Sequence, residues 1–395
     1  MKAAWVTVYN AEDPDAYETR GYYEPRSLRD QSVAIDYVGS LQTPKLFNPL
    51  FKVKRRLNRS WFVKPGDRGW YSHQRSPLLF KEYARQISRR LSKLNDVDIV
   101  CSGPSYCSQP VAYLECDQPI VIWTDGTFAD TLDFYPEYYR NRICRESIED
   151  GLANEKAALG RSKLLIYASE WAAQSAVKHY PIDPSKIRIV PWGANFECNH
   201  TLEDIRRIVD ARPVDGCKLL FFGFDWRRKR GDFAIQVAQD LNNAGLKTEL
   251  TIVSNQPQSD KPFPDFVRFL GPIRKTKGED LNRLFKLLAE SHFMILPTLA
   301  DASPYALSEA AAFGLPALTT NVGGIPTIIK DGLNGKKFSL DASSEAYCTY
   351  VSNLFSNYSQ YQSLALSSFH EYESRLNWSV AGRTVKKLLA ELVHG

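Results

Sequence analysis

The sequence has no run of about 18 or more apolar residues, so no transmembrane helix is expected. Its opening segment, MKAAWVTVYN, holds one Lys and only a short apolar run, which predicts a first strand and not a signal peptide. The seven cysteines are scattered without CxxC spacing, which disfavours a disulfide framework and a zinc site. We therefore expect a reduced, cytoplasmic chain.

Two phosphate-binding signatures are also missing. There is no GxxxxGK[ST], and no GxGxxG follows the first apolar run, so P-loop and dinucleotide-binding sites are excluded. Asp-x-Asp triplets begin at Asp13 and Asp96, and such pairs chelate divalent metals on sugar nucleotides. However, Asp98 opens an apolar strand, Asp13 brackets a proline turn, and the six His show no metal-ligand spacing. No metal site is therefore expected.

The formal net charge of +5 is unevenly distributed. The segment Lys45–Lys93 alone carries 14 Lys and Arg against Asp67 and Glu82, a net of +12, so the rest of the chain carries −7. Such a segment favours an anionic partner, either a membrane surface, a phosphorylated glycan or nucleic acid. Trp61 and Trp70 lie among these cations, which suits a membrane interface, and no nucleic-acid recognition fold accompanies them.

What is present is typical of a packed α/β protein. At 395 residues, with 44% hydrophobic and 24% charged residues, the composition predicts two domains and excludes wholesale disorder. Short β-branched runs alternate with amphipathic segments, which predicts two doubly wound, Rossmann-like domains. The expected strands are Ala3–Tyr9, Asp98–Cys101, Pro119–Trp123, Leu164–Ala168, Ile187–Pro191, Lys218–Phe222, Thr248–Val253, Val267–Leu270, Phe293–Pro297 and Ala317–Thr320. The expected helices include Leu78–Leu94, Ser147–Leu159, Glu170–His179, Asp232–Ala244, Leu281–Glu290 and Asn377–His394.

Composition also indicates the domain boundaries. The polar stretch Asn199–Pro213 is the expected linker, between a first domain at 1–200 and a second at 214–376. Lys52–Trp70 follows neither the helical nor the strand period, so we expect a mobile loop there.

The segment Phe293–Phe338 carries the clearest functional pattern. An apolar strand ends in a loop, and a helix follows for which Ser303 suits the N-cap, Pro304 the first turn and Gly314 the C-terminal cap. A helix that starts beyond the carboxyl end of a strand faces the edge where open α/β sheets bind ligands. The amides near Tyr305, Ala306 and Leu307 are then expected to face phosphates or sugar hydroxyls.

Two carboxylates flank this helix start. Asp301 lies in the loop, and Glu309 follows eight residues later on the helix. A carboxylate accepts two hydroxyl hydrogen bonds at once, which suits a ribose diol.

The second functional pattern is LLFFGFDWRRKRGDFAIQV, which begins at Leu219. A strand ends at Gly223, and three cations, Arg227, Arg228 and Lys229, precede a helix. Cations are unfavourable at a helix N-terminus, so an anion bound there would remove the conflict.

These two blocks resemble the GT-B glycosyltransferases of family 4, the group 1 transferases, of bacterial type. Asp301-x7-Glu309-Ala-Ala-Ala-Phe-Gly-Leu-Pro is similar to their acidic signature, although their first acid is usually Glu. The resemblance implies that Glu309 binds the nucleotide ribose. It also implies that Asp301 and the segment Ser303–Ala306 (Ser303, Pro304, Tyr305, Ala306) face the sugar and the phosphates.

In the same family, a basic pair after the strand glycine grips the donor diphosphate. Lys229 aligns with the family Lys, and Arg227 or Arg228 supplies the second charge. The chain departs from the family in two places, with Arg230 where a Gly is usual and Gly223-Phe224 in place of Gly-Arg.

The N-terminal half resembles a bacterial subgroup more loosely, through PIVIWTDGTFADTLDFYPEY. There the loop after the fourth strand region reaches the sugar, so Asp125 is the candidate acceptor-side residue; a turn Asp before Gly126 is the alternative. The likeness is strong over Pro119–Phe338 and weak elsewhere.

The resemblance implies two Rossmann-like domains facing an interdomain cleft, with the last helix (377–395) returning to the first domain. It implies a retaining glycosyltransferase that uses a nucleotide-diphosphate sugar and no obligatory metal. The acceptor would be a glycan or lipid-linked molecule in cell-surface polysaccharide or glycolipid synthesis, reached from the inner face of the membrane. Two alternatives stay open, a nucleotide-sugar epimerase on the same fold and a non-catalytic GT-B scaffold.

Overall fold

The computed structural model describes residues 1–16, 21–255, 262–276 and 278–394. The chain divides into two compact units, and each contains one parallel six-stranded sheet. Unit 1 comprises Met1–Val190 and Gly382–Gly395, and unit 2 comprises Pro191–Ala381. No helix of the described residues is long and apolar enough to cross a bilayer.

The sheet of unit 1 has the order β2-β1-β3-β4-β5-β6. Its strands are β1 (Lys2–Val6), β2 (Ala34–Val38), β3 (Ile99–Ser102), β4 (Ile120–Thr124), β5 (Leu164–Tyr167) and β6 (Ile187–Ile189). Its helices are α1 (Tyr23–Arg29), α2 (Phe47–Leu57), α3 (Pro77–Leu91), α4 (Phe128–Thr131), α5 (Arg145–Arg161) and α6 (Glu170–His179). Short 3₁₀ turns are η2 (Pro65–Asp67), η3 (His73–Arg75), η4 (Ser105–Tyr113), η5 (Pro136–Tyr138) and η6 (Pro184–Lys186).

The sheet of unit 2 has the order β12-β11-β10-β7-β8-β9. Its strands are β7 (Cys217–Phe222), β8 (Thr248–Val253), β9 (Val267–Phe269), β10 (Phe293–Leu296), β11 (Ala317–Thr320) and β12 (Gly335–Phe338). Its helices are α7 (Leu202–Asp210), α8 (Trp226–Lys229), α9 (Gly231–Asn243), α10 (Gly278–Glu290), α11 (Tyr305–Ala311), α12 (Ile325–Ile328), α13 (Ser344–Ser356) and α14 (Tyr358–Arg375). The last helix, α15 (Trp378–His394), begins in unit 2 and belongs to unit 1 from Gly382 onward.

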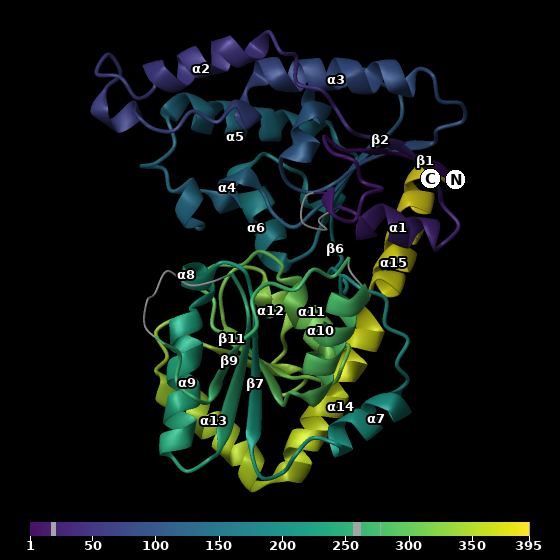
Figure 1. Ribbon diagram of the computed structural model, residues 1–395. Coiled ribbons are helices and arrows are strands. Elements are labelled where there is room, and N and C mark those ends of the chain that lie inside the picture. Colours follow the sequence, from purple (N-terminus) through teal and green to yellow (C-terminus); the bar gives the residue numbers. More distant parts are fainter. Residues whose placement is uncertain (17–20, 256–261, 277, 395) are drawn as a thin grey trace. The chain divides into compact units, whose positions relative to one another are not determined.

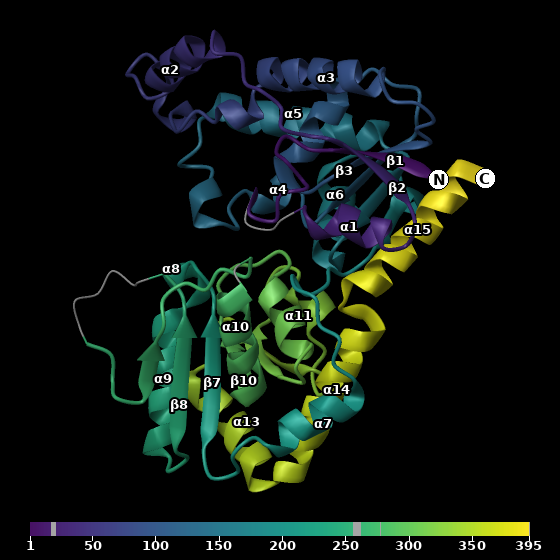
Figure 2. The ribbon, with the colours of Figure 1, turned by 45° about the vertical axis from the view of Figure 1, so that its right-hand side comes forward.

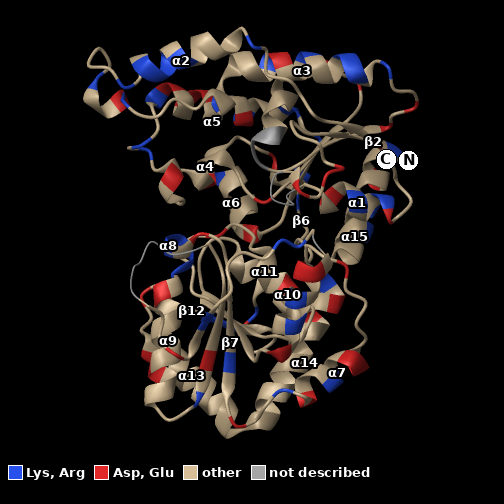
Figure 3. Cartoon of the chain, viewed as in Figure 1, with Lys and Arg blue, Asp and Glu red and all other residues tan. Residues whose placement is uncertain are grey.

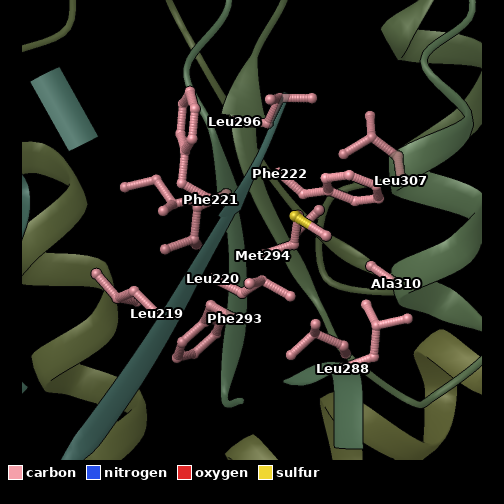
Figure 4. Packing of buried hydrophobic residues seen from close by; sticks show 14 of the residues in the cluster. Leu219, Leu220, Phe221, Phe222, Leu288, Phe293, Met294, Leu296, Leu307 and Ala310 are labelled. Atoms are coloured by element: carbon pink, nitrogen blue, oxygen red, sulfur yellow. The ribbon is translucent and has the colours of Figure 1, made fainter. Parts of the chain in front are cut away.

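Helices cover both faces of the unit 2 sheet, with α9 on one face and α10 and α11 on the other (Figures 1 and 2). Parallel strands need such crossover helices, and their apolar runs are buried from both sides. Figure 4 shows how the alternation along β7 divides the core: Leu219 points to one face, while Phe222 points toward Leu307 of α11.

Several expected elements are present, within a few residues of their predicted ends. The sequence missed β2 and β12, because β2 is only partly buried and β12 is a short edge strand, GKKF, with two lysines. The expected linker Asn199–Pro213 contains α7 within unit 2, begun by a capping box between Thr201 and Asp204.

The expectation of a loop at Lys52–Trp70 was wrong for its first part. Helix α2 covers its first part, and it packs inward through Phe51, which is 1% exposed and contacts the Tyr71 ring. In the turn after the helix, the Arg68 side chain donates to the carbonyls of Val63 at 2.6 Å and Trp61 at 3.1 Å. The helical period was hard to recognise because five cations lie among the apolar residues of Lys52–Arg59.

Candidate functional site

The two segments that the sequence singled out meet at one edge of the unit 2 sheet. Strands β7 and β10 are hydrogen-bonded parallel neighbours, so the loops that leave their carboxyl ends start side by side. The loop after β7 leads into the basic helix α8, and the loop after β10 contains Asp301 and leads into α11.

Lys229 and Asp301 form an ion pair in this place. Both side chains are 10% exposed, and a second cation, the Arg228 guanidinium, lies 3.4 Å from the other Asp301 oxygen. Arg228 is fixed by a 2.6 Å hydrogen bond to the carbonyl of Ala300. Arg228 also pairs with Asp225, whose Oδ2 lies 3.4 Å from the guanidinium Nε, so two cations and two carboxylates gather here. An anion that binds at this place would compete with the carboxylates for both cations.

The structure separates the two arginine candidates. Arg228 is 15% exposed in its side chain and faces Asp301, whereas Arg227 is exposed. Gly223 gives Lys229 its room, because a Cβ at this position would lie 3.0 Å from Lys229 Cγ. Arg230 adopts the left-handed conformation (φ 57°, ψ 52°), which glycine adopts without the steric penalty that a Cβ brings.

Glu309 is fully buried on α11, at 0% exposure. One of its oxygens, Oε1, accepts the backbone N–H of Asn195 at 3.2 Å and forms an ion pair with Lys275. The other, Oε2, has no hydrogen-bond partner among the described residues. The sequence analysis missed Lys275, because nothing in its local pattern links the loop after β9 to a glutamate 34 residues later.

The start of α11 differs from the expectation. Pro304, not Ser303, is the N-cap. Among the described residues no side chain caps the helix, and the buried Ser303 Oγ has no hydrogen-bond partner. The amide of Leu307 donates to the carbonyl of Pro304 at 3.1 Å, so it is not available to a ligand. Tyr305 stacks on Trp192, with ring centroids 5.3 Å apart and planes at 6°, and Ala306 lies beside it in the first turn.

The expected C-terminal cap is confirmed. Gly314 has φ +56°, its amide donates to Ala311, and the amide of Leu315 donates to Ala310. This pair of hydrogen bonds is a Schellman motif, which favours glycine at this position.

Asp125 lies in unit 1, in the loop between β4 and α4, and is half-buried. The loop is held by Thr127, which caps α4 by accepting the amide of Asp130 at 3.1 Å. Burial first, and then the nearby negative charge of Asp125, raise the pKa of Glu24 to about 8. Glu24 is the acidic neighbour that sequence reasoning did not find.

The Asp-x-Asp pairs hold backbone groups. An Asp98 oxygen accepts the amide of Lys2 at 2.7 Å, and an Asp13 oxygen accepts that of Asp15 at 2.9 Å. Across residues 1–16, 21–255, 262–276 and 278–394 there is no group of three or more His, Cys, Asp or Glu able to hold a metal ion.

Several known proteins are similar to this chain. Residues 216–357 match the family described as "Glycosyl transferases group 1". D-inositol 3-phosphate glycosyltransferase of Acidothermus cellulolyticus is 26% identical over 183 residues, 41% of this chain and 39% of that protein. Lipopolysaccharide glucosyltransferase WaaG of Escherichia coli is 28% identical over 183 residues, 44% of this chain and 47% of that protein. The chain thus spans less than half the length of each of these two relatives.

Among solved structures, HepE of Anabaena in complex with UDP-glucose matches over 99% of this chain and 100% of its own. The TM-score is 0.61 at 12% identity, which shows a shared fold. The two parallel six-stranded sheets and the likeness to HepE show the GT-B fold, and residues 216–357 are similar to the group 1 glycosyltransferases.

Proposed function

We propose that the protein transfers a sugar from a nucleotide-diphosphate sugar to an acceptor, with unit 2 as the donor-binding unit. The observation that carries this proposal is the pair of buried cations, Lys229 and Arg228, at the carboxyl end of β7. Two cations side by side at this edge of a parallel sheet are suited to a diphosphate.

The chemistry follows from the charge that develops on the donor. As the bond between the sugar and the diphosphate breaks, the leaving phosphate gains negative charge, so Lys229 and Arg228 stabilise the transition state more than the ground state. Asp301, once its cations turn to the diphosphate, is left to accept hydrogen bonds from sugar hydroxyls, and Glu309 accepts those of the ribose. Retention at the anomeric carbon, with the departing phosphate as proton acceptor, is part of the proposal and rests on the family.

The test is to replace Lys229 by Ala and measure transfer from a panel of nucleotide sugars that begins with UDP-glucose. Loss of a charge-assisted contact of about 1.5–3 kcal/mol lowers the rate roughly 10- to 150-fold. Lys286→Ala is the control, because Lys286 is exposed on α10. Arg228→Ala should lower the rate more than Arg227→Ala. Full activity of a folded Lys229→Ala protein would show that the donor site lies elsewhere.

For the acceptor, we propose a lipid-linked or glycan molecule reached at the inner face of a membrane, with Asp125 on the acceptor side. The names of two relatives, an inositol phosphate glycosyltransferase and a lipopolysaccharide glucosyltransferase, support this class. The second support is a surface on α2 and the turn that follows it, where Lys and Arg gather (Figure 3).

This surface, called here the α2 surface, combines apolar and basic side chains. Its apolar residues are each between 41% and 77% exposed: Leu46, Leu50, Val53, Leu57, Trp61 and Phe62. Its exposed cations are Lys52, Arg55, Arg56 and Arg59. The four aliphatic residues follow helical spacing and form one stripe, and the two aromatic rings stack with centroids 4.1 Å apart. A helix with an apolar stripe flanked by cations suits an anionic bilayer surface.

A further inference from the structure

Lys275 covers the carboxylate that the proposed function assigns to the donor ribose. Its ammonium forms an ion pair with Glu309 Oε1, and its side chain is 15% exposed, whereas Glu309 has no exposed surface. The Lys275 ammonium also lies 5.4 Å from the centroid of the Phe222 ring, at the end of β7. The lysine therefore extends from the loop after β9, past the end of β7, to α11.

A ribose cannot contact Glu309 while this arrangement persists, because the carboxylate is closed off from solvent. The other residues around Glu309 are held in place. Asn195 donates its amide to Oε1, and its side-chain oxygen accepts the Trp378 indole N–H at 3.2 Å. On α11, Leu307 and Ala310 are completely buried in the core. Lys275 is the long, flexible and partly exposed member of the group, so it is the one that moves at least cost.

We propose that Lys275 is an internal substitute for the ribose hydroxyls, and that donor binding displaces it from Glu309. This inference rests on the proposed function, since it takes Glu309 as the ribose ligand. In the free protein the ammonium satisfies the carboxylate. In the complex, the two ribose hydroxyls donate to Oε1 and Oε2, and the ammonium leaves. Oε2, which now has no partner among the described residues, gains one.

The exchange makes Lys275 a specificity-determining residue. A nucleotide with both hydroxyls replaces every hydrogen bond that the ammonium gave up, whereas a 2′-deoxynucleotide replaces only part of them. A buried polar group left unpaired is what allows a site to reject an analogue that lacks one hydroxyl. A 2′-deoxynucleotide therefore leaves Lys275 on Glu309, so its affinity depends less on the ammonium than the affinity of UDP does.

The experiment measures dissociation constants of UDP and 2′-deoxy-UDP by calorimetry for the unaltered protein, Lys275→Met and Glu309→Gln. Methionine keeps the length of the lysine stem without its charge, so Glu309 loses its internal partner. We expect Lys275→Met to bind UDP about tenfold more tightly than the unaltered protein does, with a smaller increase in affinity for 2′-deoxy-UDP. We expect Glu309→Gln to bind UDP more weakly. Lys286→Met, on the exposed face of α10, is the matched control and should bind as the unaltered protein does.

The possible outcomes distinguish a failure of this inference from a failure of the proposed function. Suppose that the unaltered protein binds UDP and that Glu309→Gln weakens this binding. If Lys275→Met then binds UDP no more tightly than the unaltered protein, only the proposed displacement of Lys275 is wrong. If the unaltered protein binds none of UDP, GDP and ADP, the donor site itself is wrong, and the inference falls with it.

A second measurement needs no variant and serves if Lys275→Met fails to fold. The lysines of the unaltered protein are labelled with an amine-reactive reagent, with and without saturating UDP, and each site is followed by mass spectrometry. Displacement predicts faster labelling of Lys275 and slower labelling of Lys229 when UDP is bound. Unchanged or slower labelling of Lys275 would overturn the inference.

Discussion

At the scale of single residues, the candidate site satisfies its own charges. Lys229 and Arg228 share Asp301, and Lys275 neutralises Glu309. A buried charge without a partner is strongly destabilising, so these cations and carboxylates stabilise the free protein by pairing with one another. Under the proposed function, donor binding is an exchange of ion pairs, and the affinity depends on how well the ligand replaces them.

Arg230 provides a test of backbone strain at this scale. Its left-handed conformation is unfavourable for a residue with a Cβ by about 1–2 kcal/mol. Its side chain partly offsets this, because the guanidinium lies 4.2 Å from the centroid of the Phe233 ring and donates to the Leu340 carbonyl at 3.2 Å. We expect Arg230→Gly to be about 1 kcal/mol more stable in denaturant unfolding than Arg230→Ala, since both lose the side chain and only glycine relieves the backbone. Equal stability of the two variants would show that the strain is absent.

At the scale of secondary-structure elements, α2 has one face that packs against the rest of unit 1 and one apolar face that is exposed to solvent. Phe51 and Lys54 face inward, where Lys54 forms an ion pair with Glu146, and the stripe of leucines and valine faces solvent. A helix that served only packing would not expose four aliphatic side chains on one line.

The α2 surface predicts binding to anionic vesicles. Exchanging Leu50 and Leu57 for Gln removes half of the aliphatic stripe and should weaken sedimentation with phosphatidylglycerol vesicles about tenfold. Raising the salt concentration should weaken it further, because the flanking cations are screened. Leu202→Gln with Leu340→Gln is the control, since both leucines are 44% exposed and belong to unit 2. An equal loss in the control, or binding indifferent to anionic lipid and salt, would contradict a membrane role.

At the scale of the whole molecule, the stabilities of the two units are expected to change with pH in opposite directions. In unit 1, burial raises the pKa of Glu24 from 4.5 to about 8 and that of Asp130 from 3.8 to about 7. These folded carboxyls keep protons that the unfolded chain has lost, so unit 1 loses stability as pH rises from about 5 to 8. In unit 2, burial first, and then the charge of Arg212, lowers the pKa of His292 from 6.5 to about 3. The unfolded chain binds a proton there that the folded unit does not, so unit 2 loses stability as pH falls below about 6.5.

Amide hydrogen exchange at pH 5.5 and 8, corrected for the intrinsic rates, measures this difference. We expect the amides of β1, β3 and β4 to be better protected at pH 5.5, and those of β7 and β10 to be better protected at pH 8. Glu24→Gln should reduce the pH dependence of unit 1 and leave that of unit 2 unchanged. A shift of both units in the same direction would contradict the assignment.

Much of the fold could be predicted from the sequence, because its signals are local. The buried strands β7, β8, β10 and β11 are continuous apolar runs, and Gly314 marks the end of α11 through a conformation that only glycine adopts freely. The family resemblance was found from the same segments. Where cations interrupted the apolar period, in α2, or where a short polar strand lay at an edge, as in β12, the pattern was too weak to recognise.

The sequence by itself therefore determined the two parallel sheets and the segments from which the site is built, because periodicity and steric preference act between residues a few positions apart. Only the tertiary structure decided how those segments pair. Lys229 meets Asp301 across 72 residues, Lys275 meets Glu309 across 34, and Arg228, not Arg227, faces the carboxylate. Ion pairs of this kind depend on strand order and on which side chains are buried together, and no local pattern along the chain contains that information.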